Sequence, residues 1–180
     1  MNTKTKSLVK TALFAALIAV GSFITVPMYP VPITLQTFFV VMAGLLLTPA
    51  EAFSAAFIFM ALGLVGLPIF AGFTGGPQSI FLPSFGFIIG FCFSSALISY
   101  LTKNMDINNK FKTFMATLAG EILLYAIGLP YMYFALRAMG TDLGSLYGVL
   151  AAGMIPFIPG DLLKMAVAVV IAPKVKNAIL

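Results

Sequence analysis

Charged residues are scarce in this chain, and histidine and tryptophan are absent from it. Aspartate, glutamate, lysine and arginine together make up 8% of its 180 residues, whereas soluble domains contain about a quarter. Cys92 is the single cysteine, so the chain cannot form an internal disulfide. Without histidine, and without a cluster of cysteines and acids at metal-binding spacing, the sequence argues against a metal site. These deficits exclude a soluble domain and leave no basis for a metal centre.

Catalytic motifs are equally scarce. The chain has no Gly-x-Ser-x-Gly motif, no glycine-rich phosphate loop ending in Lys-Ser or Lys-Thr, and no histidine base. It therefore cannot hydrolyse ATP alone. Proteolysis within a membrane is disfavoured because Asp161 has no obvious carboxylate partner except Glu121, and Lys164 has no serine at a telling spacing. We expect neither an enzyme nor a bound cofactor.

Apolar residues, by contrast, are abundant. They make up 61% of the chain and give it a mean hydropathy of +1.10, which is the composition of an integral membrane protein. A helix needs about 20 residues to cross a bilayer, so the chain holds about six spans and no sizeable soluble domain. Its apolar runs do not alternate as outer-membrane strands do, and we predict one all-α membrane domain over residues 1–180. The expected spans lie at about 9–26, 35–47, 52–67, 85–101, 111–134 and 146–172.

The second expected span is short, which suggests that it begins inside the loop before it. The basic residues indicate the orientation of all six, because cytoplasmic loops carry an excess of lysine and arginine. With six spans, the N-terminal segment, the loop between the fourth and fifth spans, and the tail lie on one side, so we predict that both termini are cytoplasmic. The uncharged loops at 27–34 and 68–83 then face outward. The three cytoplasmic segments hold eight of the ten bases, namely Lys4, Lys6, Lys10, Lys103, Lys110, Lys112, Lys174 and Lys176.

The N-terminus also permits a different interpretation. Three lysines precede an apolar run, and Ala19-Val20-Gly21 forms a small-x-small site, which is typical of a secretory signal. Cleavage there would leave five spans and break the charge pattern. We therefore favour a first span that stays in the membrane.

Asp161 and Lys164 are the most informative residues of the chain, because they lie three positions apart inside the last apolar stretch. An ionisable group at membrane depth costs roughly 2.5 to 3.5 kcal/mol on insertion scales, so a chain keeps it where it pairs, faces a cavity or contacts a ligand. At this spacing the two side chains share one helical face, and one small polar molecule can touch both. A structural ion pair without a ligand is the alternative, and the residues alone do not decide between the two.

The first span contains small residues four positions apart. Ala12 and Ala16 form one such pair, and Ala15 and Ala19 form another. This spacing lets a second helix approach closely. On the pattern alone, ordinary packing inside the protein is the simpler explanation.

Four strings of residues are landmarks along the chain. They are Pro30-Val-Pro-Ile-Thr34-Leu-Gln36-Thr37-Phe, Ala43-Gly-Leu-Leu-Leu, Gly63-Leu-Val-Gly-Leu-Pro-Ile-Phe70-Ala-Gly72 and Pro156-Phe-Ile-Pro-Gly160-Asp-Leu-Leu-Lys164. Taken in this order, they resemble the BioY family, the biotin-specific S components of energy-coupling factor (ECF) vitamin transporters. The similarity runs from about residue 8 to 172. One segment departs from the family pattern, since Leu82-Pro-Ser-Phe-Gly-Phe87 stands where the family commonly has Gly-Pro-Thr-Gly-Gly-Tyr.

The resemblance implies a six-helix protein of the plasma membrane that binds biotin with high affinity on the outer side. It further implies that the protein releases biotin inward when docked to a transmembrane coupling protein and two ATPases, which agrees with the missing ATP motifs. Family S components dock through an alanine motif on the first helix. The resemblance therefore favours a partner interface at Ala12, Ala15, Ala16 and Ala19.

The chemistry of biotin also suits the charged pair of the sixth span. Its ureido ring offers N–H donors and a carbonyl acceptor, whereas a carboxylate only accepts and an ammonium only donates. We expect Asp161 to hold the N–H groups and Lys164 the carbonyl, through charge-assisted bonds that are about twice as strong as neutral ones. Phe87 is a candidate for packing against the apolar part of biotin, with core or lipid-facing packing as the alternative.

Five polar residues are further candidate ligand contacts. Thr34 and Gln36 enter the second span from the outer loop, although Thr34 is equally suited to cap that helix. Gln78 lies in the second outer loop and is a plausible amide donor. Glu121 and Tyr125 lie one turn apart on the fifth span and are expected to line the pocket. A lysine partner for Glu121 and an interfacial position for Tyr125 are the alternatives.

Two other functions remain open on the sequence. The first is a self-sufficient secondary transporter of a small polar solute, in which Asp161 or Glu121 takes up the coupling proton. The second is a membrane scaffold whose alanines only assemble partners, which predicts no small-molecule binding. Under the biotin hypothesis, the outer loops 27–34 and 68–83 are expected to form the gate.

Overall fold

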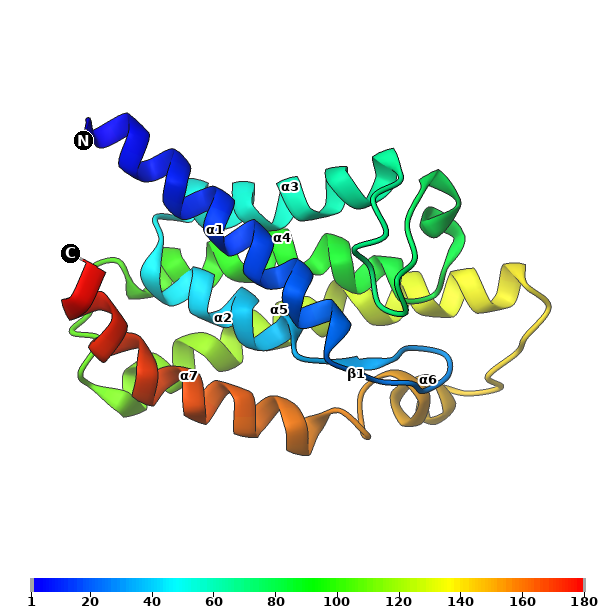
Figure 1. The fold of residues 1–180 in the computed structure, drawn as a ribbon. Helices are drawn as coiled ribbons and strands as arrows, with labels where there is room; N and C mark the ends of the chain where they lie inside the picture. Colours follow the sequence, from blue (N-terminus) through cyan, green and yellow to red (C-terminus); the bar gives the residue numbers. More distant parts are fainter. Residues whose placement is uncertain (1, 180) are drawn as a thin grey trace.

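The computed structural model describes residues 2–179, most of which are helical (Figure 1). Both ends of the chain lie at one end of the molecule, and α6 lies at the opposite end. Two short strands, β1 (Thr25–Val26) and β2 (Ile33–Thr34), pair antiparallel between the first two helices. The helices are α1 (Thr3–Phe23), α2 (Gln36–Leu46), α3 (Pro49–Val65), the 3-10 helix η1 (Pro77–Phe81), α4 (Phe85–Thr102), α5 (Lys110–Ala138), α6 (Leu146–Gly153) and α7 (Ile158–Ile179).

Three of the described helices, α1, α4 and α5, are long and apolar enough to cross a membrane. The α6–α7 pair forms a fourth candidate span, bent by 50° at a short break. The expected last span at 146–172 is therefore divided between two helices. The expectation that α2 begins inside the preceding loop is not met, because it begins at Gln36 and has 11 residues. Such a helix is about 16 Å long, roughly half of a bilayer core.

The middle of the fold is held together by α4, which packs against α2, α3 and α5. Ile98 of α4 is fully buried between Gly44 of α2 and Gly120 of α5. A Cβ atom at Gly44 would lie 2.7 Å from the Ile98 Cβ, so only glycine permits this approach. Small residues bring helix backbones close in membrane proteins, and here they fix α2 and α5 on the two sides of α4.

Polar side chains inside the helix bundle mostly donate to backbone carbonyls. Ser95 Oγ donates to the Ala52 carbonyl at 3.1 Å, and Ser99 Oγ donates to the Leu47 carbonyl at 2.6 Å. Both bonds tie α4 to the region where α2 ends and α3 runs. Buried polar groups without partners are costly in an apolar medium, so these bonds make the buried serines compatible with a membrane interior.

The four alanines of α1 point in different directions. Ala12 and Ala16 are exposed, whereas Ala15 is 5% exposed and Ala19 packs against the buried core. Ala12 and Ala16 therefore suit a contact surface for another helix, whereas Ala15 and Ala19 pack inside the protein. The exposed pair lies among other exposed apolar residues of α1, namely Leu8, Val9, Leu13 and Val20.

Candidate ligand-binding site

A cavity of about 240 Å³ lies where α2, α4, α5 and α7 meet beneath the two loops expected to face outward. It is somewhat smaller than the usual range of ligand pockets, about 300 to 1,000 Å³. The first loop contributes Pro30, Val31 and Pro32 to its wall. The second loop contributes Phe70, Ala71, Thr74, Ser79 and Leu82. The helices contribute Gln36, Thr37, Phe87, Ile88, Phe91, Glu121, Leu124, Tyr125, Asp161 and Lys164.

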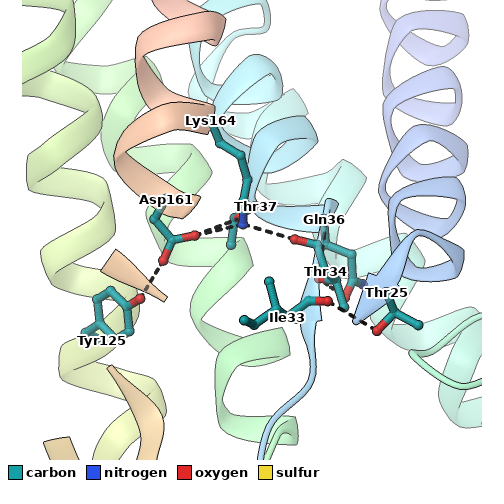
Figure 2. A network of polar contacts seen from close by, with 8 residues as sticks. All are labelled: Thr25, Ile33, Thr34, Gln36, Thr37, Tyr125, Asp161 and Lys164. Atoms are coloured by element: carbon teal, nitrogen blue, oxygen red, sulfur yellow. Dashed lines mark hydrogen bonds and ion pairs between the residues drawn. The ribbon is translucent and has the colours of Figure 1, made fainter. Parts of the chain in front are cut away.

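The Asp161–Lys164 ion pair lies in the wall of this cavity (Figure 2). Lys164 Nζ donates to Asp161 Oδ1 at 2.8 Å, to Thr37 Oγ1 at 2.6 Å and to the Thr34 carbonyl at 3.0 Å. The side chains of Lys164 and Asp161 are 13% and 5% exposed. An ammonium has three donors, so the protein engages all of them and holds the charge at the α2–α7 junction.

Asp161 lies in the first turn of α7, where the helix dipole favours a negative charge. Its Oδ2 accepts a 2.5 Å hydrogen bond from Tyr125 Oη, and its Oδ1 also accepts from Thr37 at 3.4 Å. A carboxylate has about four acceptor positions. With Lys164, three positions are engaged, so Asp161 keeps an acceptor position for a further donor.

Two buried polar atoms of the cavity wall have no hydrogen-bond partner among the described residues. They are Nε2 of Gln36, a donor, and Oε1 of Glu121, an acceptor. Both residues are 5% exposed. An unsatisfied buried group costs about 1–3 kcal/mol. A ligand that offers both an acceptor and a donor removes that cost, so the cavity is prepared for a molecule of mixed polarity.

The first loop and the start of α2 hold Gln36 in place. Thr34 Oγ1 donates to Gln36 Oε1 at 3.1 Å and accepts from the Gln36 backbone N–H at 3.3 Å. Thr25 Oγ1 donates to the Ile33 carbonyl at 3.2 Å and closes the β1–β2 ribbon beside it (Figure 2). The amide of Gln36 is therefore oriented through its oxygen, which leaves the nitrogen for the cavity.

Aromatic side chains form much of the apolar wall. The ring of Phe87 meets the ring of Tyr125 edge to face, with centroids 6.1 Å apart. Phe91 and Phe157 are also buried in the wall. The cavity therefore has one polar side, formed by α2, α7 and the polar residues of α5, and an apolar side suited to rings and alkyl chains.

The second loop is attached to the helix bundle at several points. The Ser22 hydroxyl oxygen lies 2.6 Å from the Ile69 carbonyl oxygen and hydrogen-bonds to it, and Gly76 N–H donates to the Gly63 carbonyl at 2.7 Å. Tyr131 Oη donates to the Ile80 carbonyl and so ties η1 to α5. These contacts place Phe70 and Ser79 over the cavity.

The structure brings seven of the eight predicted ligand contacts to the cavity, namely Thr34, Gln36, Phe87, Glu121, Tyr125, Asp161 and Lys164. It does not bring Gln78 there. The Gln78 side chain is exposed, and its Nε2 donates to the Gly75 carbonyl at 2.6 Å.

Thr37 was not predicted, because its contact with Lys164 joins residues 127 positions apart. In the segment that departs from the family pattern, Leu82, Ser84 and Phe87 line the cavity.

Comparisons with known proteins agree on one family. A family model described as the BioY family matches residues 1–180. "Probable biotin transporter BioY" of Pyrococcus horikoshii is 38% identical over 97% of this chain and 98% of its own length. "Biotin transporter BioY" of Thermotoga maritima is 34% identical over 96% of each chain. The crystal structure of the S-component for biotin from an ECF-type ABC transporter superposes with a TM-score of 0.84 at 32% identity, covering 98% of this chain and 95% of that one.

Proposed function

The chain belongs to the BioY family, and from this premise we propose that it is the biotin-binding S component of an ECF-type importer. The observation that carries the proposal is the buried Asp161–Lys164 pair in the wall of a cavity with unpaired polar atoms. Its role is to capture and move a ligand, so it is a transport protein and not an enzyme. Biotin is its cargo, and no cofactor takes part.

The ureido ring of biotin lies against the polar side of the cavity in this proposal. Asp161 accepts one ureido N–H at its remaining acceptor position, and Glu121 accepts the other at Oε1. Gln36 Nε2 and Lys164 donate to the ureido oxygen. Lys164 does so by giving up one of its three protein contacts. The thiophane ring and the valeryl chain then pack against Phe87.

The six-span topology with both termini in the cytoplasm is part of the same proposal. Three helices and the bent α6–α7 pair supply four spans by length and composition. We assign α2 and α3 as the other two, with the β1–β2 loop completing the depth that the short α2 does not cover. The shared position of the two termini in Figure 1 supports an even number of spans.

The two loops above the cavity act as its gate. Pro30, Val31 and Pro32 of the first loop line the cavity together with Phe70 and Ala71 of the second. Binding of biotin brings these walls together over the ligand. Limited proteolysis of the purified protein tests this role. Cleavage in the segment 27–34 should slow when biotin saturates the site, and an unchanged rate would contradict the gate.

Transport requires partners, which we propose are a transmembrane coupling protein and two ATPases in the plasma membrane. Uptake of radiolabelled biotin by vesicles that contain the chain alone or with these subunits tests the assignment. We expect uptake only with the full set of subunits and with ATP. Uptake by the chain alone, abolished by an uncoupler and indifferent to ATP, would instead identify a proton-coupled transporter.

A further inference from the structure

A second hollow lies behind the ligand cavity, on the surface between α5 and α6. This open groove has a volume of about 620 Å³. It meets the cavity at Tyr125, which lines both. The residues of α5 in the groove recur at helical spacing on one face, and they are almost all apolar. The groove is lined by Ile122, Tyr125, Ala126, Leu129, Pro130, Tyr133, Phe134, Gly144, Ser145, Leu146, Val149 and Leu150.

Arg137 lies at the rim of this groove. Its Nη1 donates to Tyr133 Oη at 3.0 Å, and Tyr133 belongs to the groove wall. The Arg137 side chain is exposed, and the one ion pair among the described residues is that of Asp161 and Lys164. Asp142, the acid nearest in sequence, accepts instead from the Gly144 backbone N–H at 2.9 Å. The guanidinium therefore has free donors and no carboxylate partner in the described chain.

The position of Arg137 within the molecule sets it apart from the other bases. It lies in the last turn of α5, and Figure 1 shows this end of α5 away from the two chain ends. Apart from Lys164 in the cavity wall, the remaining bases belong to the N-terminal segment, the α4–α5 region and the C-terminal segment. A single cation without an acidic partner in the part of the chain that the structure describes therefore lies next to an apolar groove at this end of the molecule. A phospholipid has a charged phosphate and apolar acyl chains, so it complements both features.

We propose that the groove binds one acyl chain of an anionic phospholipid and that Arg137 binds its phosphate. A guanidinium matches the phosphate oxygens with two parallel hydrogen bonds. Basic pockets between membrane helices bind anionic head groups in this way. Tyr133 accepts a hydrogen bond from the guanidinium and also lines the apolar groove. Tyrosine is enriched at membrane interfaces, where apolar and polar surroundings meet in this way. The groove shares Tyr125 with the ligand cavity, but lipid binding there does not require biotin and stands independently of the transport assignment.

Native mass spectrometry of the full chain in neutral detergent tests this site with two probes, phosphatidylglycerol and phosphatidylcholine. We expect phosphatidylglycerol to be retained about fivefold more than phosphatidylcholine, because one arginine distinguishes the two head groups. Arg137→Gln should abolish that preference. Ala126→Leu should lower retention of both lipids, because the added side chain fills the groove. Both positions are exposed, and the unfolding temperature of each variant confirms that it folds.

Lys112→Gln is the matched control, since Lys112 is an exposed base at the other end of α5. It should leave the lipid preference unchanged. Equal retention of the two lipids, or the same loss in Lys112→Gln as in Arg137→Gln, would overturn the proposal. A dimer that Ala126→Leu dissociates would also overturn it, because the occupant would then be a second copy of the chain.

Discussion

Glu121 illustrates how a single residue can be kept for ligand binding at the expense of stability. Its carboxyl group is buried on α5, and one oxygen has no partner among the described residues. In an apolar surrounding such a group lowers the stability of the empty protein. A residue that served only the fold would be apolar here. The same reasoning applies to the Nε2 atom of Gln36, which faces the same cavity.

Glu121→Met should therefore raise the unfolding temperature of the ligand-free protein and weaken biotin binding. Methionine fills a similar volume and leaves no buried polar atom, and we expect a stability gain of about 1 kcal/mol. Thermal unfolding with and without biotin measures both effects. Glu51→Met is the control, because Glu51 accepts from Thr48 N–H at 2.9 Å in the capping box of α3. It should lower stability by about 1 kcal/mol and leave biotin binding intact. A less stable Glu121→Met protein with unchanged binding would contradict this role.

At the scale of residues, the sequence reveals charged groups more readily than their partners. Asp161 and Lys164 were predictable because charges are rare in an apolar stretch and these two share a helical face. Thr37 was not, because a threonine in a membrane helix is ordinary and its contact with Lys164 depends on how α2 meets α7. The exposed position of Gln78 likewise depends on a local bond to the Gly75 carbonyl.

Hydropathy predicts the apolar runs of the chain better than the bounds of the helices within them. An apolar run marks where a chain enters the membrane, but it does not show where a helix breaks. Residues 146–172 form two helices bent by 50°, and the break places Phe157 at the cavity and Asp161 in a first helical turn. Pro156 and Pro159 are the signal that favoured a break there, because proline disrupts a continuing helix.

Gly63 links α3 to the loop above the cavity. A Cβ atom at this position would collide with the ring of Phe70, and the Gly63 carbonyl also accepts from Gly76 N–H. Gly63→Ala should therefore displace Phe70, lower the unfolding temperature and weaken biotin binding by about tenfold, since overpacking costs about 1–3 kcal/mol. Gly160→Ala is the matched control, because its Cβ would meet only the Lys164 side chain, at an ordinary 3.9 Å. Equal behaviour of the two variants in calorimetric titration would contradict the account.

The whole molecule has a binding cavity beneath the two outer loops and an exposed apolar surface on α1. Ala12 and Ala16 are exposed there, while Ala15 is buried against the other helices. The alanine spacing indicated a contact surface but did not show which alanines face outward. That division depends on how α1 packs against α2 and α3. Under the proposed function, the exposed pair meets the coupling protein.

Ala12→Leu combined with Ala16→Leu should abolish biotin uptake by the complete transporter and leave biotin binding by the isolated chain unchanged. The larger side chains prevent close approach of a partner helix but touch no residue of the cavity. Ala138→Leu, at an exposed position at the end of α5, should leave both properties unchanged. Ala15→Leu should instead destabilise the protein, because this alanine is buried. Normal uptake by the double variant would show that the partner does not bind this surface.

Isothermal titration of the purified chain with biotin tests the central claim most directly, with Asp161→Asn and Lys103→Gln measured beside the wild type. Asp161→Asn removes the charged acceptor of a ureido N–H, and a hydrogen bond to a charged group contributes about 1.5–3 kcal/mol, so we expect a loss of about tenfold or more in affinity. We expect one tight site in the wild type, that loss in Asp161→Asn, and unchanged affinity in Lys103→Gln, whose lysine lies exposed beyond α4. A folded wild type that does not bind biotin, or an Asp161→Asn protein that binds it equally tightly, would contradict the account.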